Sequence, residues 1–501
     1  MNRKIKVLLN FSSGLLKQVI VILCGFILPR YILLSYGSAI TGLISSITHF
    51  LGFISLLDMG VGPVVQASLY KPLSQKNTTE ISKILKASDV FFKRIALFFI
   101  IYIVILSVIY PCFINKEFDA FFTISILLII SVSTFAEYFF GITYKLLLTA
   151  DQKSYVISAL QLCTVVLNTI VSIILILNGF SIRVVKLGSA VLFVLRPLIQ
   201  MLYVKKHYKI EKIDKKQKAS LPQKWDSFAQ HLATVVLENV DVVVLSITSN
   251  LINVAIYNVY YSVAFNVKNL IISSVTGLES LFGDMIAKNE TLKLTKTFNL
   301  IEFVIHFVVM LIFTTAAILI VPFVRVYTRG ISDANYTMPL FGFILVMAYA
   351  GQCLRLPYLR LVNGAGMFKE TRIGALVAMF LNIIITVCAV KPFGLVGVAT
   401  GTFIAMLFHT VYFVMFLRNH IINRSVLHFI LHLVVDILVF CTSYFITKDF
   451  ILEKLTYSSW ICLGIKVFLC VFVCDTVLNF IVYYKQIFKF IDLKIHRRTL
   501  F

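Results

Sequence analysis

Apolar stretches, each close to the ~20 residues that a helix needs to cross the hydrocarbon core of a bilayer, recur along the whole chain. Only 14% of the 501 residues are charged and 59% are hydrophobic, whereas soluble domains carry about 25% charged residues. A water-soluble globule is therefore excluded. The sequence predicts an all-α, polytopic membrane protein that performs its function within or across a bilayer.

About fourteen transmembrane helices can be drawn, which suggests two six-helix lobes followed by two C-terminal helices. The predicted spans are 11–34, 39–62, 91–113, 120–144, 155–178, 183–203, 227–248, 252–275, 300–324, 337–358, 371–391, 395–417, 426–447 and 460–484. A basic segment with eight Lys and Arg residues separates the two sets of six. We therefore expect an N-terminal lobe at 1–204, a cytoplasmic linker at 205–226, a C-terminal lobe at 227–420, and two additional helices with a basic cytoplasmic tail at 421–501.

The formal charge of +23 does not by itself indicate a nucleic-acid-binding surface. Lys and Arg gather in alternate connections between the spans, which is the bias that places basic loops in the cytoplasm. This pattern predicts cytoplasmic N- and C-termini in a bacterial inner membrane. The basic start at Arg3 leads into an apolar run without a small-residue cleavage site, so we expect an uncleaved first helix. The nine cysteines form no CxxC pair, and neither a metal site, a cofactor nor a disulfide framework is predicted.

Four of the cations within predicted spans are candidates for function, because an ionisable side chain there costs about 2.5–3.5 kcal/mol and usually faces a bundle interior or a watery cavity. Lys268 is in the body of the eighth span, where an interface is hard to reach for a snorkelling side chain. Lys17 and Arg30 lie in the first span, and snorkelling remains an equal alternative for both. Arg196 lies in the sixth span, beside a proline. These four residues are the candidates for a cationic substrate cavity.

The acidic candidates for ion coupling are Glu238, Asp241 and Asp58. Glu238 and Asp241 are three residues apart and so share a face of the seventh span, where they form either a proton or sodium site or an ion pair with a cation such as Lys268. Asp58 ends the second span just before the glycines Gly60 and Gly62, which permit close helix contact, and a structural role is an alternative for it. The tyrosines within 257–261 are candidates for stacking on a sugar.

The sequence resembles the polysaccharide flippases of the multidrug/oligosaccharidyl-lipid/polysaccharide exporter superfamily, the Wzx-type proteins, and the resemblance covers essentially the whole chain. The segments that carry the resemblance are 14–37 with Pro29-Arg30 and Ser35-Tyr36-Gly37, Leu57-Asp58-Met59-Gly60-Val61-Gly62, Glu238-Asn239-Val240-Asp241, Tyr257-Asn258-Val259-Tyr260, Gly283-Asp284 with Ala287, and 394–401.

The resemblance implies a MATE-like fold of two lobes with an alternating-access cycle. It further implies a cationic cleft that accepts the pyrophosphate and sugars of an undecaprenyl-linked oligosaccharide, with Lys17, Arg30, Arg196 and Lys268 as the plausible equivalents in this chain. Proton or sodium coupling is common in the superfamily, and a polysaccharide polymerase and glycosyltransferases are further candidate partners.

Three alternatives remain open: a lipid II flippase, a drug or cation antiporter of the same superfamily, and a membrane polysaccharide polymerase. The intramembrane cations argue against an antiporter for cationic drugs. The absence of a large loop between the predicted spans argues against an enzyme. No glycine-rich phosphate loop, nucleophile elbow or zinc signature occurs in the sequence, so transport driven by ATP within this chain is not expected.

Overall fold

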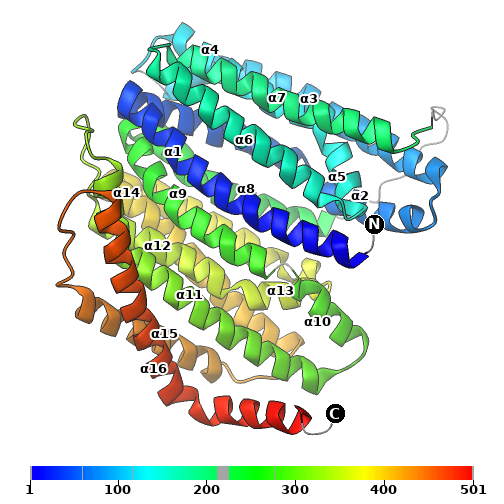
Figure 1. Cartoon of the computed structure of the whole chain (residues 1–501), viewed down its shortest axis with the longest axis vertical. Helices are drawn as coiled ribbons and strands as arrows, with labels where there is room; N and C mark the ends of the chain where they lie inside the picture. Colours follow the sequence, from blue (N-terminus) through cyan, green and yellow to red (C-terminus); the bar gives the residue numbers. More distant parts are fainter. Residues whose placement is uncertain (1–2, 59, 115–116, 212–224, 276, 499–501) are drawn as a thin grey trace. The chain divides into compact units, whose positions relative to one another are not determined.

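A computed structural model describes residues 3–58, 60–114, 117–211, 225–275 and 277–498, and these residues form helices joined by short connections (Figure 1). The α-helices are α1 (Arg3–Gly52), α2 (Val61–Ser74), α3 (Thr78–Ile109), α4 (Ala120–Ala136), α5 (Ile142–Ala150), α6 (Ser154–Leu177), α7 (Ile182–His207), α8 (Trp225–Thr248), α9 (Leu251–Ser274), α10 (Leu278–Ala287), α11 (Thr291–Tyr327), α12 (Pro339–Leu354), α13 (Leu356–Gly364), α14 (Phe368–His420), α15 (Leu427–Thr447) and α16 (Tyr457–Arg498). A 3₁₀ helix, η1 (Phe53–Asp58), follows α1, and two π-helical turns, η2 (Tyr110–Ile114) and η3 (Glu137–Gly141), follow α3 and α4.

Within the described ranges, twelve helices are long and apolar enough to cross a membrane. Two of them each contain a glycine whose backbone is not helical: Gly37 in α1 (φ 82°, ψ 175°) and Gly394 in α14 (φ 55°, ψ −131°). A positive φ is accessible to glycine because it has no Cβ. Each break falls between two of the predicted spans, so the breaks account for the difference between twelve helices and about fourteen spans. The chain is thus an all-α, multi-pass membrane protein, as predicted.

The outer surfaces of the helices are apolar, as expected for spans that face lipid. On α3, Phe99 and Ile103 are buried, whereas Leu97, Ile101 and Val104 on the opposite side are more than half exposed. A helix that is apolar on all sides is typical of a membrane span, because neither its packed face nor its outer face meets water.

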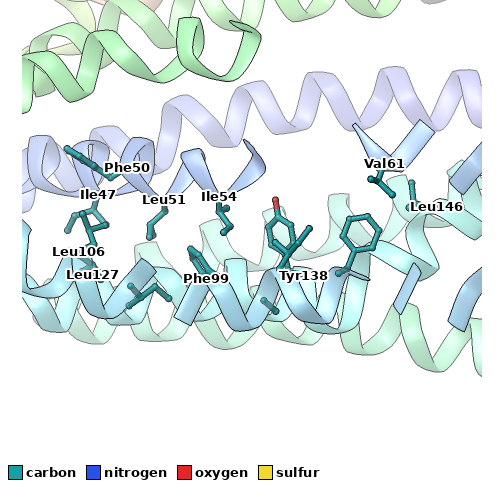
Figure 2. Close-up of a cluster of buried hydrophobic side chains, with 14 of the residues drawn as sticks. Ile47, Phe50, Leu51, Ile54, Val61, Phe99, Leu106, Leu127, Tyr138 and Leu146 are labelled. Carbon is teal, nitrogen blue, oxygen red and sulfur yellow. The ribbon is translucent and has the colours of Figure 1, made fainter. Parts of the chain in front are cut away.

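The chain divides into two compact units, Met1–Ile256 and Tyr257–Phe501. In unit 1, α1 packs on α6 and α8, and α7 packs on α4 and α6. Its apolar core lies between the end of α1, η1, α3, α4 and η3, and Phe50, Ile54, Phe99 and Tyr138 belong to this cluster (Figure 2). In unit 2, α12 packs on α11 and α14, and α15 and α16 pack on α11.

Two short helices, α2 and α10, were not predicted from the sequence. In unit 1, α2 follows the second span and packs on α5, which ends the fourth span. In unit 2, α10 follows α9 and packs on α13, which follows α12 directly. The same order of elements and the same pairing occur in both units, which supports the duplication that the sequence only suggested.

The contacts place α8 in unit 1, where it packs on α1. The predicted C-terminal lobe begins earlier, at 227, and most of the predicted linker, 212–224, lies outside the described residues. The lobe limits of 1–204 and 227–420 therefore stay a prediction.

Candidate functional site

Two of the predicted cavity cations, Lys17 and Arg30, lie on α1 in unit 1 and are half-buried. They are thirteen residues apart, which corresponds to about 20 Å along a helix. The structure therefore does not bring them together. Lys17 instead has a like-charged neighbour, Lys145 on α5, which the sequence analysis did not single out.

Arg196, the third predicted cation, is paired with an acid. Its guanidinium donates to the Glu137 carboxylate at 2.8 Å, and the Lys145 ammonium lies 3.7 Å from the same carboxylate. Glu137 begins the π-helical turn η3, a feature often found at functional sites. Gly141, which ends this turn, approaches Pro197 of α7 so closely that an added Cβ would lie 2.9 Å from the proline ring.

Asp58 completes this group of charges. Its carboxylate accepts a hydrogen bond of 3.1 Å from the Tyr138 hydroxyl and is within electrostatic range of Lys145 and His231. In Figure 2 the Tyr138 side chain extends from the core toward the segment that carries Ile54. The unit 1 charge cluster, as we name it, comprises Lys17, Asp58, Glu137, Lys145 and Arg196. It has three cations and two carboxylates, and so an excess of positive charge.

The acidic pair of α8 shares a helix face, as its spacing implies. Asp241 is 3% exposed and Glu238 is half-buried. On another side of α8, Asn239 and Ser246 contact α1: Asn239 Oδ1 lies 3.0 Å from Nδ1 of His49, and Ser246 bonds with a serine of α1 at 2.6 Å. Glu238 is within electrostatic range of His49 of α1. The predicted role of the acidic pair in ion coupling stays a prediction.

Lys268 of α9, in unit 2, is only 3% exposed. Its ammonium lies 4.5 Å from the centre of the Phe265 ring and 5.3 Å from that of Tyr349. Cation–π contacts of this kind contribute about 0.5–2 kcal/mol when desolvated. Asn266, which we expected to help wet this region, donates to the backbone of its own helix at 2.8 Å. A snorkelling position is therefore excluded for Lys268.

The tyrosines of α9 are mainly structural. Tyr257 and Tyr260 are 1% and 0% exposed. The Tyr260 hydroxyl donates to the Tyr336 carbonyl at 2.7 Å and accepts from the Met338 backbone N–H at 3.0 Å. Since its hydroxyl holds the connection before α12, Tyr260 is not available for stacking on a sugar.

A buried polar network in unit 2 was not predicted from the sequence. Glu302 of α11, which is 0% exposed, forms an ion pair with Arg424 and accepts a hydrogen bond from the Tyr358 hydroxyl. One turn further along α11, Nδ1 of His306 lies 2.7 Å from Oδ2 of Asp436 on α15. The members of this unit 2 network are Glu302, His306, Tyr358, Arg424, His432, Asp436, Asp475 and Tyr483.

The network connects the two C-terminal helices to α11. The His432 ring of α15 is stacked on His306 with 4.7 Å between centres, and its Nδ1 is bonded to the Tyr483 hydroxyl of α16 at 2.8 Å. Asp475 accepts from the Asn479 amide on its own helix at 2.7 Å. A signal was present in the sequence, since Glu302–His306 and His432–Asp436 are both i,i+4 pairs of ionisable residues in apolar runs.

No family model matches the sequence, and no curated protein matches it either. Solved structures do match its fold. A structure described as "Lipid II flippase MurJ, inward closed conformation" has a TM-score of 0.70 and 15% identity, over 96% of this chain and 100% of that one.

MATE transporters match a smaller share of the chain. An inward-facing multidrug resistance MATE family transporter of the MOP superfamily has a TM-score of 0.54 and 14% identity, over 82% of this chain and 98% of that one. A MATE transporter from Vibrio cholerae has a TM-score of 0.56 and 12% identity, over 83% and 98%. The chain is therefore a multi-pass membrane protein with the fold that MurJ and the MATE transporters share.

Proposed function

We propose that the chain is a flippase that moves undecaprenyl-pyrophosphate-linked oligosaccharide repeat units across the bacterial cytoplasmic membrane by alternating access, for polysaccharide biosynthesis. One observation carries the proposal. The similarity to the lipid II flippase extends over 96% of this chain and all of that one, whereas the MATE similarity covers 82%. A lipid-linked cargo is thus favoured over the cationic drug of an antiporter.

The charges inside the spans fit an anionic cargo. A pyrophosphate that enters a region of low dielectric constant needs fixed positive partners, and charge-assisted hydrogen bonds from Lys and Arg are the strongest available. The unit 1 charge cluster offers Lys17 and Lys145 beyond the cation that Glu137 balances directly. Lys268 is a further buried cation in unit 2. Arg30 remains a candidate, although it lies thirteen residues from Lys17 along α1.

The alternatives are ranked by the same observations. A lipid II flippase is the second candidate, because MurJ itself bears that description. An antiporter for cationic drugs would be expected to have a predominantly acidic site, which the unit 1 charge cluster does not provide. The similarity to transporters rather than to enzymes also favours a flippase over a polysaccharide polymerase.

Deletion of the gene, followed by analysis of lipid-linked intermediates, tests the proposal. Loss of a repeat-unit flippase should trap short undecaprenyl-pyrophosphate oligosaccharides on the inner leaflet, while peptidoglycan synthesis continues. If lipid II accumulates instead, the second candidate replaces the first. If no glycolipid accumulates, the flippase proposal is wrong.

Ion coupling is tested with the acidic pair of α8. Glu238→Gln combined with Asp241→Asn should weaken the dependence of export on the proton or sodium gradient while the protein still inserts. Asp58→Asn is the comparison, because Asp58 is bonded to Tyr138 and lies in the unit 1 charge cluster. An unchanged dependence on both gradients in the α8 variant would count against the role of the pair.

A further inference from the structure

The unit 2 network contains more carboxylates than permanent cations. Its described members include three carboxyl groups (Glu302, Asp436 and Asp475) and one guanidinium (Arg424). All three acids are at most 8% exposed, and an uncompensated charge is costly in such surroundings. Two further positive charges are needed for neutrality, and protons on the network are the simplest source.

His306 is positioned to take up a proton. Its Nδ1 is engaged with Asp436 at 2.7 Å, whereas its Nε2 is buried and has no hydrogen-bond partner among the described residues. The imidazole has a pKa near physiological pH in water, so its second nitrogen can bind a proton under ordinary conditions. The groups around His306 are Glu302 on its own helix, Tyr358, Arg424, His428, His432 and Asp436, with Asp475 and Tyr483 on α16.

Asp475 is a second acceptor. It is 0% exposed, its Oδ1 accepts from Asn479, and its Oδ2 has no hydrogen-bond partner among the residues described. It is within electrostatic range of Asp436 across α15 and α16. Two buried carboxylates within electrostatic range repel each other when both are charged, and a proton on one of them removes the repulsion.

Solvent can reach one end of the network. A polar hollow of about 530 Å³ is lined by Arg418, Asn419, His420, Ile421 and Asn423, directly before Arg424. Beside it, Tyr358 and Arg424 line a cavity of about 10 Å³, close to the smallest space that holds one water molecule. Asp436 lies nine residues into α15, about 14 Å along the helix, so the network leads from the helix end to near the middle of the span.

We propose that the unit 2 network is a proton-binding site, in which protons from solvent bind at His306 Nε2 and on one of Asp436 and Asp475 and thereby hold α15 and α16 against α11. The inference rests on the proposed function and deepens it, because it adds a proton site in unit 2 to the candidate coupling acids of α8. Within the described ranges, no three His, Cys, Asp or Glu side chains are grouped so as to hold a metal ion. The buried histidine and carboxyl groups of the network are the groups that favour a proton site.

Infrared difference spectroscopy of the reconstituted full chain tests the proposal with the proton itself as the probe. A change of pH should produce a band of a buried carboxyl group. Asp436→Asn and Asp475→Asn should each remove or diminish this band, and the exposed Asp284→Asn should leave it unchanged. His306→Gln retains both carboxyl groups and should shift the pH at which the band develops. An unchanged band in all three network variants, or no such band in the natural protein, overturns the proposal.

Trp460 of α16 provides a readout of the helix contact. Its indole N–H donates to the Leu319 carbonyl of α11 at 3.4 Å, and its ring lies 5.2 Å from Phe323. In a Trp225→Phe background, Trp460 is the single tryptophan, and its emission should titrate with the infrared band. A band without a change in emission would refute the coupling to α16. Neither measurement needs the cargo, so a negative result here leaves the flippase proposal intact. The flippase proposal is tested independently by the analysis of lipid-linked intermediates after gene deletion.

Discussion

Removal of Arg424 is expected to destabilise unit 2 strongly. The Glu302 carboxylate that it pairs with is fully buried, and the Arg424 side chain is 10% exposed, so solvent screens the pair very little. Breaking a buried pair by removing one partner costs about 3–5 kcal/mol, because the other charge is left uncompensated. For a unit of this size each kcal/mol corresponds to about 2–4 °C. We therefore expect Arg424→Met to lower the melting temperature by roughly 6–20 °C.

The double variant separates charge from packing. Glu302→Gln together with Arg424→Met removes both charges of this pair, and neutral replacement of a buried pair is often without cost. Its melting temperature should therefore return most of the way to that of the natural protein. The matched control is Lys288→Met, because the Lys288–Asp284 pair is about 60% exposed and exposed pairs contribute about 0–1 kcal/mol.

The assay is thermal unfolding of the purified protein in detergent, followed by intrinsic fluorescence, for the natural protein, both single variants, the double variant and the control. Two results would refute the reasoning. One is a loss in Arg424→Met no larger than in Lys288→Met. The other is a double variant as unstable as Arg424→Met, which would mean that the packing of the arginine matters and its charge does not.

Two further substitutions test the candidate site and the fold. Lys268→Glu should abolish export while the protein remains in the membrane, as measured by surface polymer and immunoblotting of membranes, because the site loses a cation; full polymer production would remove Lys268 from the site. Lys296→Glu, at an exposed position of α11, should export normally. Gly42→Ala should sharply reduce the amount of folded protein, because its Cβ would lie 1.8 Å from the Leu251 carbonyl oxygen; Gly25→Ala, with open space around it, should not, and equal yields of the two would contradict the model of close contact.

The membrane spans could be predicted because their signal is local. A run of apolar residues bounded by Lys and Arg fixes a span without any knowledge of its neighbours. Even the glycine breaks at Gly37 and Gly394 were visible as short polar or small-residue interruptions. The short helices α2 and α10 were missed because each depends on a partner, α5 or α13, that lies far along the chain.

The pairing of charges could not be predicted, since it depends on packing between helices. Arg196 was selected as a cavity cation because it lies in a span, yet its partner Glu137 is 59 residues away and is brought to it by a π-helical turn. Asp436 likewise has a distant partner, His306 of α11, which lies 130 residues away along the chain. The unit 2 network as a whole could not be predicted, because its members come from separate stretches of sequence.

The π-helical turn at Glu137–Gly141 holds one residue more than a regular turn needs. The additional residue shifts the helical register of every residue that follows it. One residue corresponds to about 100° of rotation and 1.5 Å of rise. Loss of a single residue from this turn would therefore swing the Lys145 ammonium away from Glu137, without changing either side chain. The number of residues in the turn, as well as their types, thus determines which charged side chains of this unit are paired.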